Sequence, residues 1–268
     1  MIEKLSMMAI FAHPDDEAFG NGGSLAKYAH EGIDMHLVTA TLGEAGQVAD
    51  PDMISTRTLS VLREQELRCA CQQYGDINLH LLGYIDGQTA IVPPSTAVYK
   101  IVKLLRLHKP QVVISFGPDG IYGHFDHLVV HRWASAAITL AAEPEKWLAA
   151  GQPYQVQKFY YRVMPQTQID AMIKVMGRNF VSMDGSIPFP LTGYSADQIT
   201  TTVDVSAFAQ AKLNGIRCHG SQLSPDFPYL KEDYDYTGDL MFTQETFILA
   251  ESHVETDLPE TDLFAGLR

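Results

Sequence analysis

The sequence predicts a doubly wound α/β fold, in which helices cover both faces of a mostly parallel β-sheet. Short apolar runs alternate with segments of helical periodicity through the first half of the chain. Several of these runs end in polar or glycine-containing loops, as expected where a sheet carries chemistry at the carboxyl ends of its strands. The chain has 268 residues, 46% of them hydrophobic and 19% charged, so it can bury one large core.

The first strand is predicted at residues 7–11, where five apolar residues stand together. Gly20, Gly22 and Gly23 follow, and we interpret them as the approach to a short helix over 24–29. Their spacing fits neither G-x-G-x-x-G nor a phosphate-binding P-loop. We therefore expect the glycines to allow close packing at the start of this helix.

The next elements continue the alternation. Strands are predicted at 35–40, 77–82 and 111–116, and the apolar residues of the last are continuous and β-branched, as in a buried parallel strand. The intervening helices are predicted at 55–74 and 97–108 from apolar residues at helical spacing. Short right-handed crossovers would bring the loops after these strands to one edge of the sheet.

A further helix is predicted to run through Ala142 from the polar segment that starts at His124. Beyond Gly151 the pattern loosens, and the remaining predictions are strands at 158–162, 200–205 and 245–250 and helices at 166–176 and 208–219. We see no linker, repeat or low-complexity segment. The sequence is therefore interpreted as one domain over 1–268, with a core at 5–150 and a more variable part at 151–268.

Charge and cysteine content narrow the function classes. Lys and Arg total 19 against 32 Asp and Glu, a formal charge of −13, which argues against nucleic acid or an anionic membrane as the partner and favours a small molecule. No run approaches the length of a transmembrane helix, and no signal peptide is recognised. Cys69, Cys71 and Cys218 are too few and scattered for a disulfide framework. We expect free thiols packed as small core residues and a cytoplasmic protein, with association into a homo-oligomer left open.

Two polar clusters carry the chemistry. His13 and one of Asp15 and Asp16 follow the first strand and offer an imidazole and a carboxylate to a metal of borderline softness. His124 and His127 stand three apart at a helix start, so both imidazoles lie on one face. His127 is the natural third ligand, which leaves the open position that catalytic zinc requires. The same ligands would accept Fe²⁺, Mn²⁺ or Co²⁺.

The sequence resembles a known family through four motifs, A-H-P-D-D-E at 12–17, T-x-G-E-x-G at 41–46, R-x-x-E-L at 63–67 and H-x-D-H at 124–127. These motifs are similar to those of the zinc-dependent deacetylases of the PIG-L/LmbE type, which remove acetyl from N-acetylglucosaminyl conjugates. The resemblance spans most of residues 5–135. It implies a Rossmann-like fold, a catalytic zinc ion and an amino-sugar conjugate as substrate.

The resemblance also implies residue roles. It assigns Asp16 to the metal and Asp15 to the base that takes a proton from the attacking water. His124, close to the metal without binding it, would stabilise the oxyanion or protonate the departing amine. Asp126 would orient a neighbouring imidazole, or else serve as a carboxylate at a helix N-terminus. Tyr122 would approach the oxyanion, or else only pack within its loop.

Arg63 and Asp86 match positions that face the sugar in relatives. For Arg63 the alternative is an internal ion pair with Glu66. The loop at 183–194 and the segment at 225–236 are candidate walls of the substrate site.

Three other functions compete with an amino-sugar deacetylase. The same chemistry on a larger thiol-sugar conjugate would make the protein an amidase. A non-catalytic sugar-binding protein could keep the metal for structure, although a structural zinc site needs no neighbouring base such as Asp15. A nucleotide-binding oxidoreductase is disfavoured because the glycine fingerprint is missing.

Overall fold

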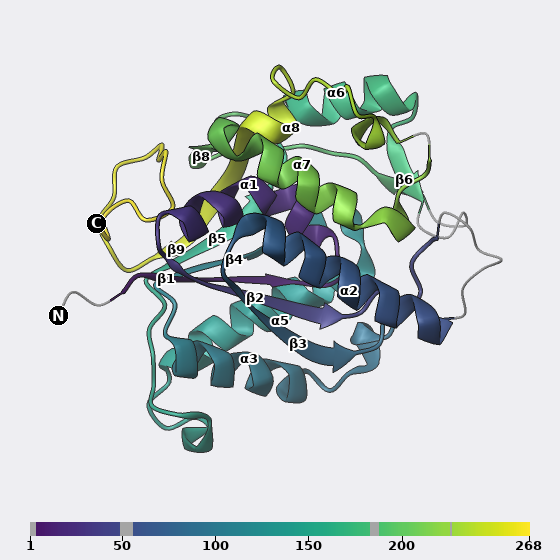
Figure 1. Ribbon diagram of the computed structural model, residues 1–268. Helices are drawn as coiled ribbons and strands as arrows, with labels where there is room; N and C mark the ends of the chain where they lie inside the picture. Colours follow the sequence, from purple (N-terminus) through teal and green to yellow (C-terminus); the bar gives the residue numbers. More distant parts are fainter. Residues whose placement is uncertain (1–3, 49–55, 183–187, 226) are drawn as a thin grey trace.

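The computed structural model describes residues 4–48, 56–182, 188–225 and 227–268, and the main feature within them is a seven-stranded sheet (Figure 1). The strand order is β3-β2-β1-β4-β5-β9-β8. The first five strands in this order pair in parallel, whereas β9 pairs antiparallel with both of its neighbours. The predicted mostly parallel α/β sheet is therefore confirmed. The strands are β1 (Ser6–Phe11), β2 (Asp34–Thr41), β3 (Ile77–Tyr84), β4 (Val112–Phe116), β5 (Lys158–Val163), β8 (Thr201–Asp204) and β9 (Gln244–Ser252).

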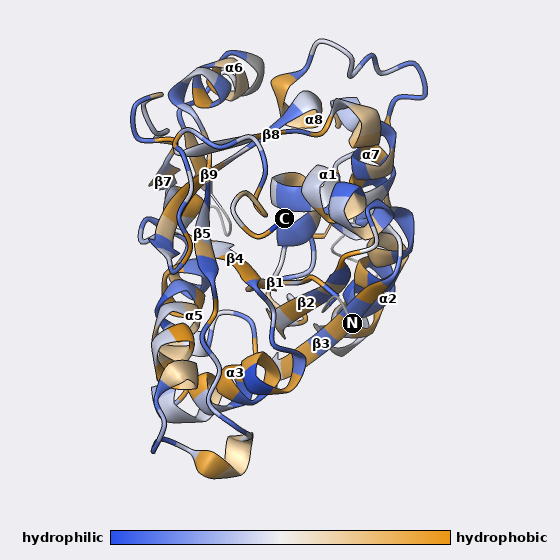
Figure 2. Cartoon of the chain, turned by 90° about the vertical axis from the view of Figure 1, so that its left-hand side faces the viewer, coloured by the Kyte–Doolittle hydropathy of each residue, from blue (hydrophilic) through white to orange (hydrophobic). Residues whose placement is uncertain are grey.

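Helices cover both faces of the sheet (Figure 1). On one face α1 (Asp16–His30), α2 (Thr56–Tyr74) and α7 (Ala209–Cys218) pack against one another, and on the other α3 (Pro94–His108) packs against α5 (Phe125–Ala142). Apolar residues gather along the central strands between these layers (Figure 2). The shorter elements are α4 (Gly120–Gly123), α6 (Gln166–Met176), α8 (Leu240–Thr243), the pair β6 (Phe180–Ser182) and β7 (Pro188–Pro190), and the 3-10 helices η2 (Thr89–Ile91), η3 (Leu148–Ala150), η4 (Ser206–Phe208), η5 (Gly220–Gln222) and η6 (Pro228–Leu230).

The strand order places a switch point beside β1. From β1 the chain builds outward through β2 and β3, then returns to add β4 and β5 on the other side. The loops after β1 and β4 consequently diverge, and such a divergence opens a crevice at the carboxyl ends of the two strands. Both polar clusters that the sequence singles out lie there. Among the described residues no helix is long and apolar enough to cross a membrane.

Helix α1 differs from its prediction, because it begins at Asp16 instead of residue 24 and contains all three glycines. Glycine is a poor helix former, but tertiary contacts override that preference here. A Cβ on Gly23 would lie 2.7 Å from Val205, and one on Gly22 would lie 3.1 Å from the Tyr74 ring. The glycines therefore do serve close packing, from inside the helix.

The cysteine prediction was wrong for two of the three residues. Cys69 of α2 and Cys218 of α7 form a disulfide across a sequence separation of 149 residues. The packing of α2 against α7 places their Cα atoms 5.8 Å apart, within the usual range for a bridge. Cys71 is a free, buried thiol, as expected.

Candidate metal centre

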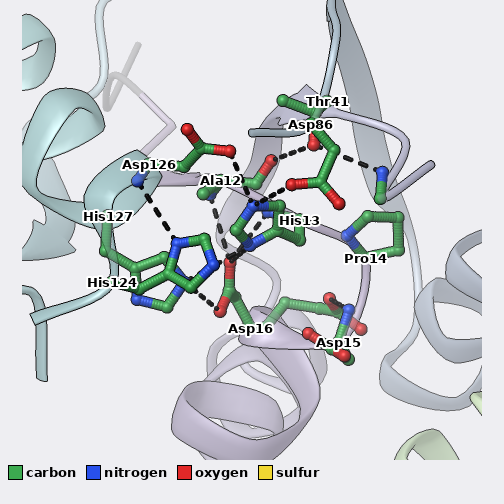
Figure 3. Close-up of polar contacts among 12 residues, drawn as sticks. Ala12, His13, Pro14, Asp15, Asp16, Thr41, Asp86, His124, Asp126 and His127 are labelled. Carbon is green, nitrogen blue, oxygen red and sulfur yellow. Dashed lines mark hydrogen bonds and ion pairs between the residues drawn. The ribbon is translucent and has the colours of Figure 1, made fainter. Parts of the chain in front are cut away.

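The first half of the site is built where β1 turns into α1. The Asp16 Oδ2 atom accepts hydrogen bonds from the backbone N–H groups of His13, at 2.8 Å, and Ala12, at 3.2 Å. Asp15 completes the turn with a φ of 110°, a conformation that is costly for a residue other than glycine. This backbone folds the Asp16 carboxylate back over the end of the strand, beside the His13 ring (Figure 3).

The second half comes from the segment after β4, and it brings His127 of α5 to the same point. The His127 Nε2 atom lies 3.2 Å from Asp16 Oδ1 and 3.3 Å from His13 Nδ1. The His13 Nδ1 atom in turn lies 3.6 Å from Asp16 Oδ2. Ligand atoms 2.0–2.1 Å from a tetrahedral zinc ion are separated by about 3.3 Å. The three side chains therefore fit a zinc-sized ion without rearrangement.

The outer nitrogen of each imidazole is already engaged. The His127 Nδ1 atom lies 3.1 Å from the Gly120 carbonyl oxygen, to which it can only donate. The His13 Nε2 atom lies 3.1 Å from Asp86 Oδ1 and 3.2 Å from Asp126 Oδ2. These acceptors keep the protons on the outer nitrogens and leave the lone pairs of the inner nitrogens facing Asp16.

Asp126 is fixed independently of the imidazole. Besides His13, it accepts hydrogen bonds from the backbone N–H of Gly87, at 2.7 Å, and from the Thr89 hydroxyl. Burial alone would raise the pKa of Asp126, but these hydrogen bonds outweigh burial and hold the pKa below its usual value. The carboxylate consequently stays ionised as the acceptor behind His13.

Asp15 stands beside the ligand cluster, held by Arg63. The Arg63 guanidinium donates to Asp15 Oδ2 at 3.0 Å, to the Gly43 carbonyl at 2.9 Å and to the Pro14 carbonyl. Burial raises the pKa of the Asp15 carboxyl to about 6, although the neighbouring guanidinium acts in the opposite direction. Asp16 therefore contacts the two imidazoles, whereas the Asp15 carboxylate contacts Arg63.

A buried pair lies behind Asp15. The Glu17 Oε2 atom accepts the Asp15 backbone N–H at 3.0 Å, and Glu17 Oε1 lies 2.7 Å from His219 Nε2. Both side chains are almost completely buried. Through this contact the C-terminal part of the chain supports the conformation of the turn at Asp15.

His124 and Tyr122 border the site on the side of β7. The His124 Nδ1 atom accepts the Asp126 backbone N–H at 3.2 Å, so the neutral ring carries its proton on Nε2. Tyr122 follows Ile121, whose φ of 69° is strained for a β-branched residue. The Tyr122 ring centroid lies 5.3 Å from that of His127 and 6.2 Å from that of Phe189, which belongs to the loop predicted as a substrate wall. Residues 183–187 of that loop and residue 226 of the second predicted wall lie outside the described residues.

Arg63 and Asp86 are placed against other site residues. Arg63 is 3% exposed and pairs with Asp15. Its suggested partner Glu66 instead accepts hydrogen bonds from the Ser221 N–H and hydroxyl, both at 2.7 Å. Asp86 accepts from the Ala45 N–H at 3.1 Å and faces His13. Contact of either residue with a sugar stays a prediction.

Sequence reasoning missed three contacts that support the site. Thr89, which hydrogen-bonds to Asp126, lies in a 3-10 helix that has no recognisable sequence pattern. Gly120 contacts His127 through its backbone carbonyl, a group that every residue has and that a sequence motif therefore does not mark. The contact between His219 and Glu17 joins residues 202 apart in sequence. Only the fold brings these groups together.

Comparison with known proteins identifies relatives of this chain. Residues 8–138 match the family model PIG-L, described as GlcNAc-PI de-N-acetylase. The 1D-myo-inositol 2-acetamido-2-deoxy-alpha-D-glucopyranoside deacetylase of Streptomyces scabiei is 31% identical over 97% of this chain and 89% of its own. The mycothiol S-conjugate amidase of Streptomyces coelicolor is 28% identical over 100% of this chain and 99% of its own.

Among solved structures, the N,N'-diacetylchitobiose deacetylase of Pyrococcus horikoshii has the same fold. It is 22% identical, with a TM-score of 0.68 over 91% of this chain and 83% of its own. The family model covers the segment that supplies His13, Asp16 and His127, and the relatives extend the match over nearly the whole chain. The chain therefore belongs to the PIG-L family of de-N-acetylases.

Proposed function

We propose that the protein is a zinc-dependent hydrolase that removes the acetyl group from the amide nitrogen of an N-acetylglucosamine conjugate. The glucosaminyl-inositol class is the first candidate substrate, because it is the substrate named for the Streptomyces scabiei relative. The observation that carries the proposal is that His13, Asp16 and His127 contact one another. Asp15 lies beside them and is paired with Arg63 instead. Three protein ligands with a neighbouring base suit catalysis better than a closed structural site.

The roles follow from the contacts. His13, Asp16 and His127 would hold the ion, which when bound would acidify a water molecule and polarise the acetyl carbonyl. Asp15 accepts the proton of the attacking water, since its carboxylate lies beside the ligand cluster and Arg63 holds it in place. Asp86 and Asp126 keep the His13 proton on the outer nitrogen throughout.

His124 is the group that acts on the opposite side of the amide. Its Nδ1 atom is occupied by the Asp126 N–H, so its Nε2–H is the atom available to donate to the oxyanion or to the departing amine. Tyr122 packs against His127 and Phe189, and its proposed role is to approach the same oxyanion. Arg63 acts through Asp15, as a positioning residue.

A second candidate keeps the chemistry and enlarges the substrate. The similarity to the mycothiol S-conjugate amidase spans the whole chain, so cleavage of a thiol-sugar amide is the alternative to deacetylation of a sugar-inositol. In both cases the partner is a small molecule. A cytoplasmic location remains a proposal, and the disulfide removes the free-thiol argument for it.

The test measures the release of primary amine from four substrates, namely N-acetylglucosaminyl-inositol, N,N'-diacetylchitobiose, N-acetylglucosamine and a bimane conjugate of mycothiol. Zinc-loaded protein is expected to release amine, and chelated protein to release none. Asp15→Asn should lose about 10²–10⁴ in kcat while keeping the metal. Asp170 is an exposed residue of α6 whose carboxylate accepts from Gln166, so Asp170→Asn, the same chemical change, should match the wild type.

The outcomes separate the candidates. Preference for the bimane conjugate over every acetylated sugar would replace the deacetylase with the amidase. Full turnover by Asp15→Asn would remove the proposed base. Stoichiometric metal binding without turnover of any of the four substrates would favour a sugar-binding protein. His13→Ala and His127→Ala should each lose the metal, and retention of a full equivalent would remove that residue from the ligand set.

A further inference from the structure

A second histidine cluster lies away from the catalytic edge. His36 of β2, His80 of β3 and His108, the last residue of α3, meet on one face of the sheet. One nitrogen from each ring lies within 4.8 Å of the other two, and the His36 and His108 ring centroids are 4.1 Å apart. His36 stands five residues before Thr41, where β2 ends, a path of about 16 Å along the strand. The cluster is thus separate from the His13 site.

The register of the sheet creates this meeting. In β2 and β3, His80 is paired with Val38, two residues beyond His36, so the two histidine side chains point to the same face. That face is covered by α3, which returns along the sheet between β3 and β4 and ends at His108 (Figure 1). His80 and His108 are half-buried, so the cluster is reachable from solvent.

The proton positions suit a cation. The His36 Nε2 atom lies 3.2 Å from Asp34 Oδ2, and this carboxylate keeps the proton on Nε2. The lone pair on His36 Nδ1 then faces His80 Nε2 at 3.1 Å, close to the separation of two ligands on one zinc ion. Asp126 and Asp86 likewise keep the proton of His13 on its Nε2 atom.

The electrostatics favour the neutral, ligating form of the rings. Burial lowers the pKa of all three histidines, with further lowering of His36 and His80 by His108, and the pKa of His80 falls to about 4. Among the described residues, Asp34 and Lys4 also act on the cluster electrostatically, and the Lys4 Nζ atom lies 4.0 Å from Asp34 Oδ1. The C-terminal end of α3 adds a partial negative charge, which favours a cation.

We propose that His36, His80 and His108 bind a second divalent cation of borderline softness, with Zn²⁺ as the first candidate. Three imidazoles leave at least one position for water. The ion would connect β2, β3 and α3, so its role is to stabilise the fold, and the deacetylation chemistry does not depend on it.

The experiment counts equivalents of bound metal. Chelator-stripped protein is titrated with Zn²⁺ against a chromophoric competitor, and the wild type should bind two equivalents. His80→Gln and His108→Gln should each bind one and keep wild-type amine release. The control is His253→Gln, the same substitution at an exposed histidine, and this variant should still bind two equivalents of Zn²⁺.

A second measurement isolates the new site. The variant His13→Ala/His127→Ala, which lacks two catalytic ligands, should still bind one Co²⁺ ion with the visible absorption of a nitrogen-coordinated centre, and His108→Gln in that background should abolish it. One equivalent in the wild type, or two in His108→Gln, would overturn the proposal. Because His108 is a half-buried residue at a helix end, this variant decides the question even where His80→Gln fails to fold.

Discussion

Replacing Gly23 by Ala tests the close packing of α1 against Val205. The first turn of this helix supplies Asp16. An exposed glycine in a helix is less favourable than alanine by about 0.5–1 kcal/mol. At Gly23, however, the added Cβ would lie 2.7 Å from both Cβ and Cγ2 of Val205, about 1 Å closer than an ordinary carbon contact. Neither atom belongs to a flexible end, so the helix or the segment at Val205 must shift.

The matched control is Gly20→Ala in the same helix. There the new Cβ would lie 3.6 Å from the Arg162 side chain, an ordinary contact, so the helix preference is gained without overlap. Overpacking at Gly23 should cost about 1–3 kcal/mol. It also disturbs the hydrogen bonds that Glu245 accepts from the N–H groups of Gly23 and Ser24, at 3.0 and 2.8 Å.

The expected result is a change of opposite sign in the two variants. Gly20→Ala should raise the free energy of unfolding by up to about 1 kcal/mol, and Gly23→Ala should lower it by about 1–2 kcal/mol. Urea denaturation followed by circular dichroism at 222 nm measures both, and each kcal/mol corresponds to about 2–4 °C in Tm. Equal stabilisation by the two substitutions would refute the packing role of Gly23.

Three further predictions concern the metal centre and a buried ion pair. Asp126→Asn and Asp86→Asn should each weaken Zn²⁺ binding at the catalytic site by about 10–100-fold, because each removes one of the two carboxylates that face the His13 Nε2 atom; unchanged competition titrations in both variants would contradict this. His124→Gln should keep the catalytic metal and lose at least about 10²-fold in kcat, and loss of the metal would make His124 a ligand. Lys212→Met should lower the free energy of unfolding by about 3–5 kcal/mol by leaving the Glu245 carboxylate buried and unpaired, and Lys212→Met/Glu245→Gln should recover most of it in urea titrations. Burial raises the pKa of Glu245, but Lys212 lowers it, and the net shift is downward. The ion pair should therefore contribute its full free energy of unfolding above about pH 4.3 and lose it as the pH falls further. A stability difference between the wild type and the double variant that does not change with pH would argue against this.

The sheet could be predicted where local pattern and burial agree. The runs at 7–11 in β1 and 112–114 in β4 are continuously apolar, and every residue of these two strands is buried. The beginning of α1 could not be predicted, because three glycines argue locally for a loop and only their contacts with Tyr74 and Val205 explain a helix. The disulfide could not be predicted for a similar reason, because nothing in the spacing of Cys69 and Cys218 shows that their helices pack together.

The site shows the same division between local and distant information. The motifs predict His13, Asp16 and His127 as ligands, and the fold brings their atoms together across 114 residues. The partner of Arg63 could not be chosen from sequence, because Glu66 is its neighbour on the same helix whereas Asp15 lies 48 residues away. The second histidine cluster has no motif, because its members meet only through strand register and the end of α3.

The position of Phe189 has a consequence for how the specificity of this protein could be redesigned. The proposed ligands and base all come from the first 127 residues, while the aromatic side chain that borders Tyr122 and His124 comes from β7, in the less regular part of the chain. Chimeras that exchange only the segment at 180–190, which contains β6 and β7, would therefore keep the proposed ligands and base while changing the predicted substrate wall. The proposed ligands and base and the predicted wall at 183–194 thus lie in separate stretches of the chain, and a library directed at the wall would leave the ligands and the base unchanged.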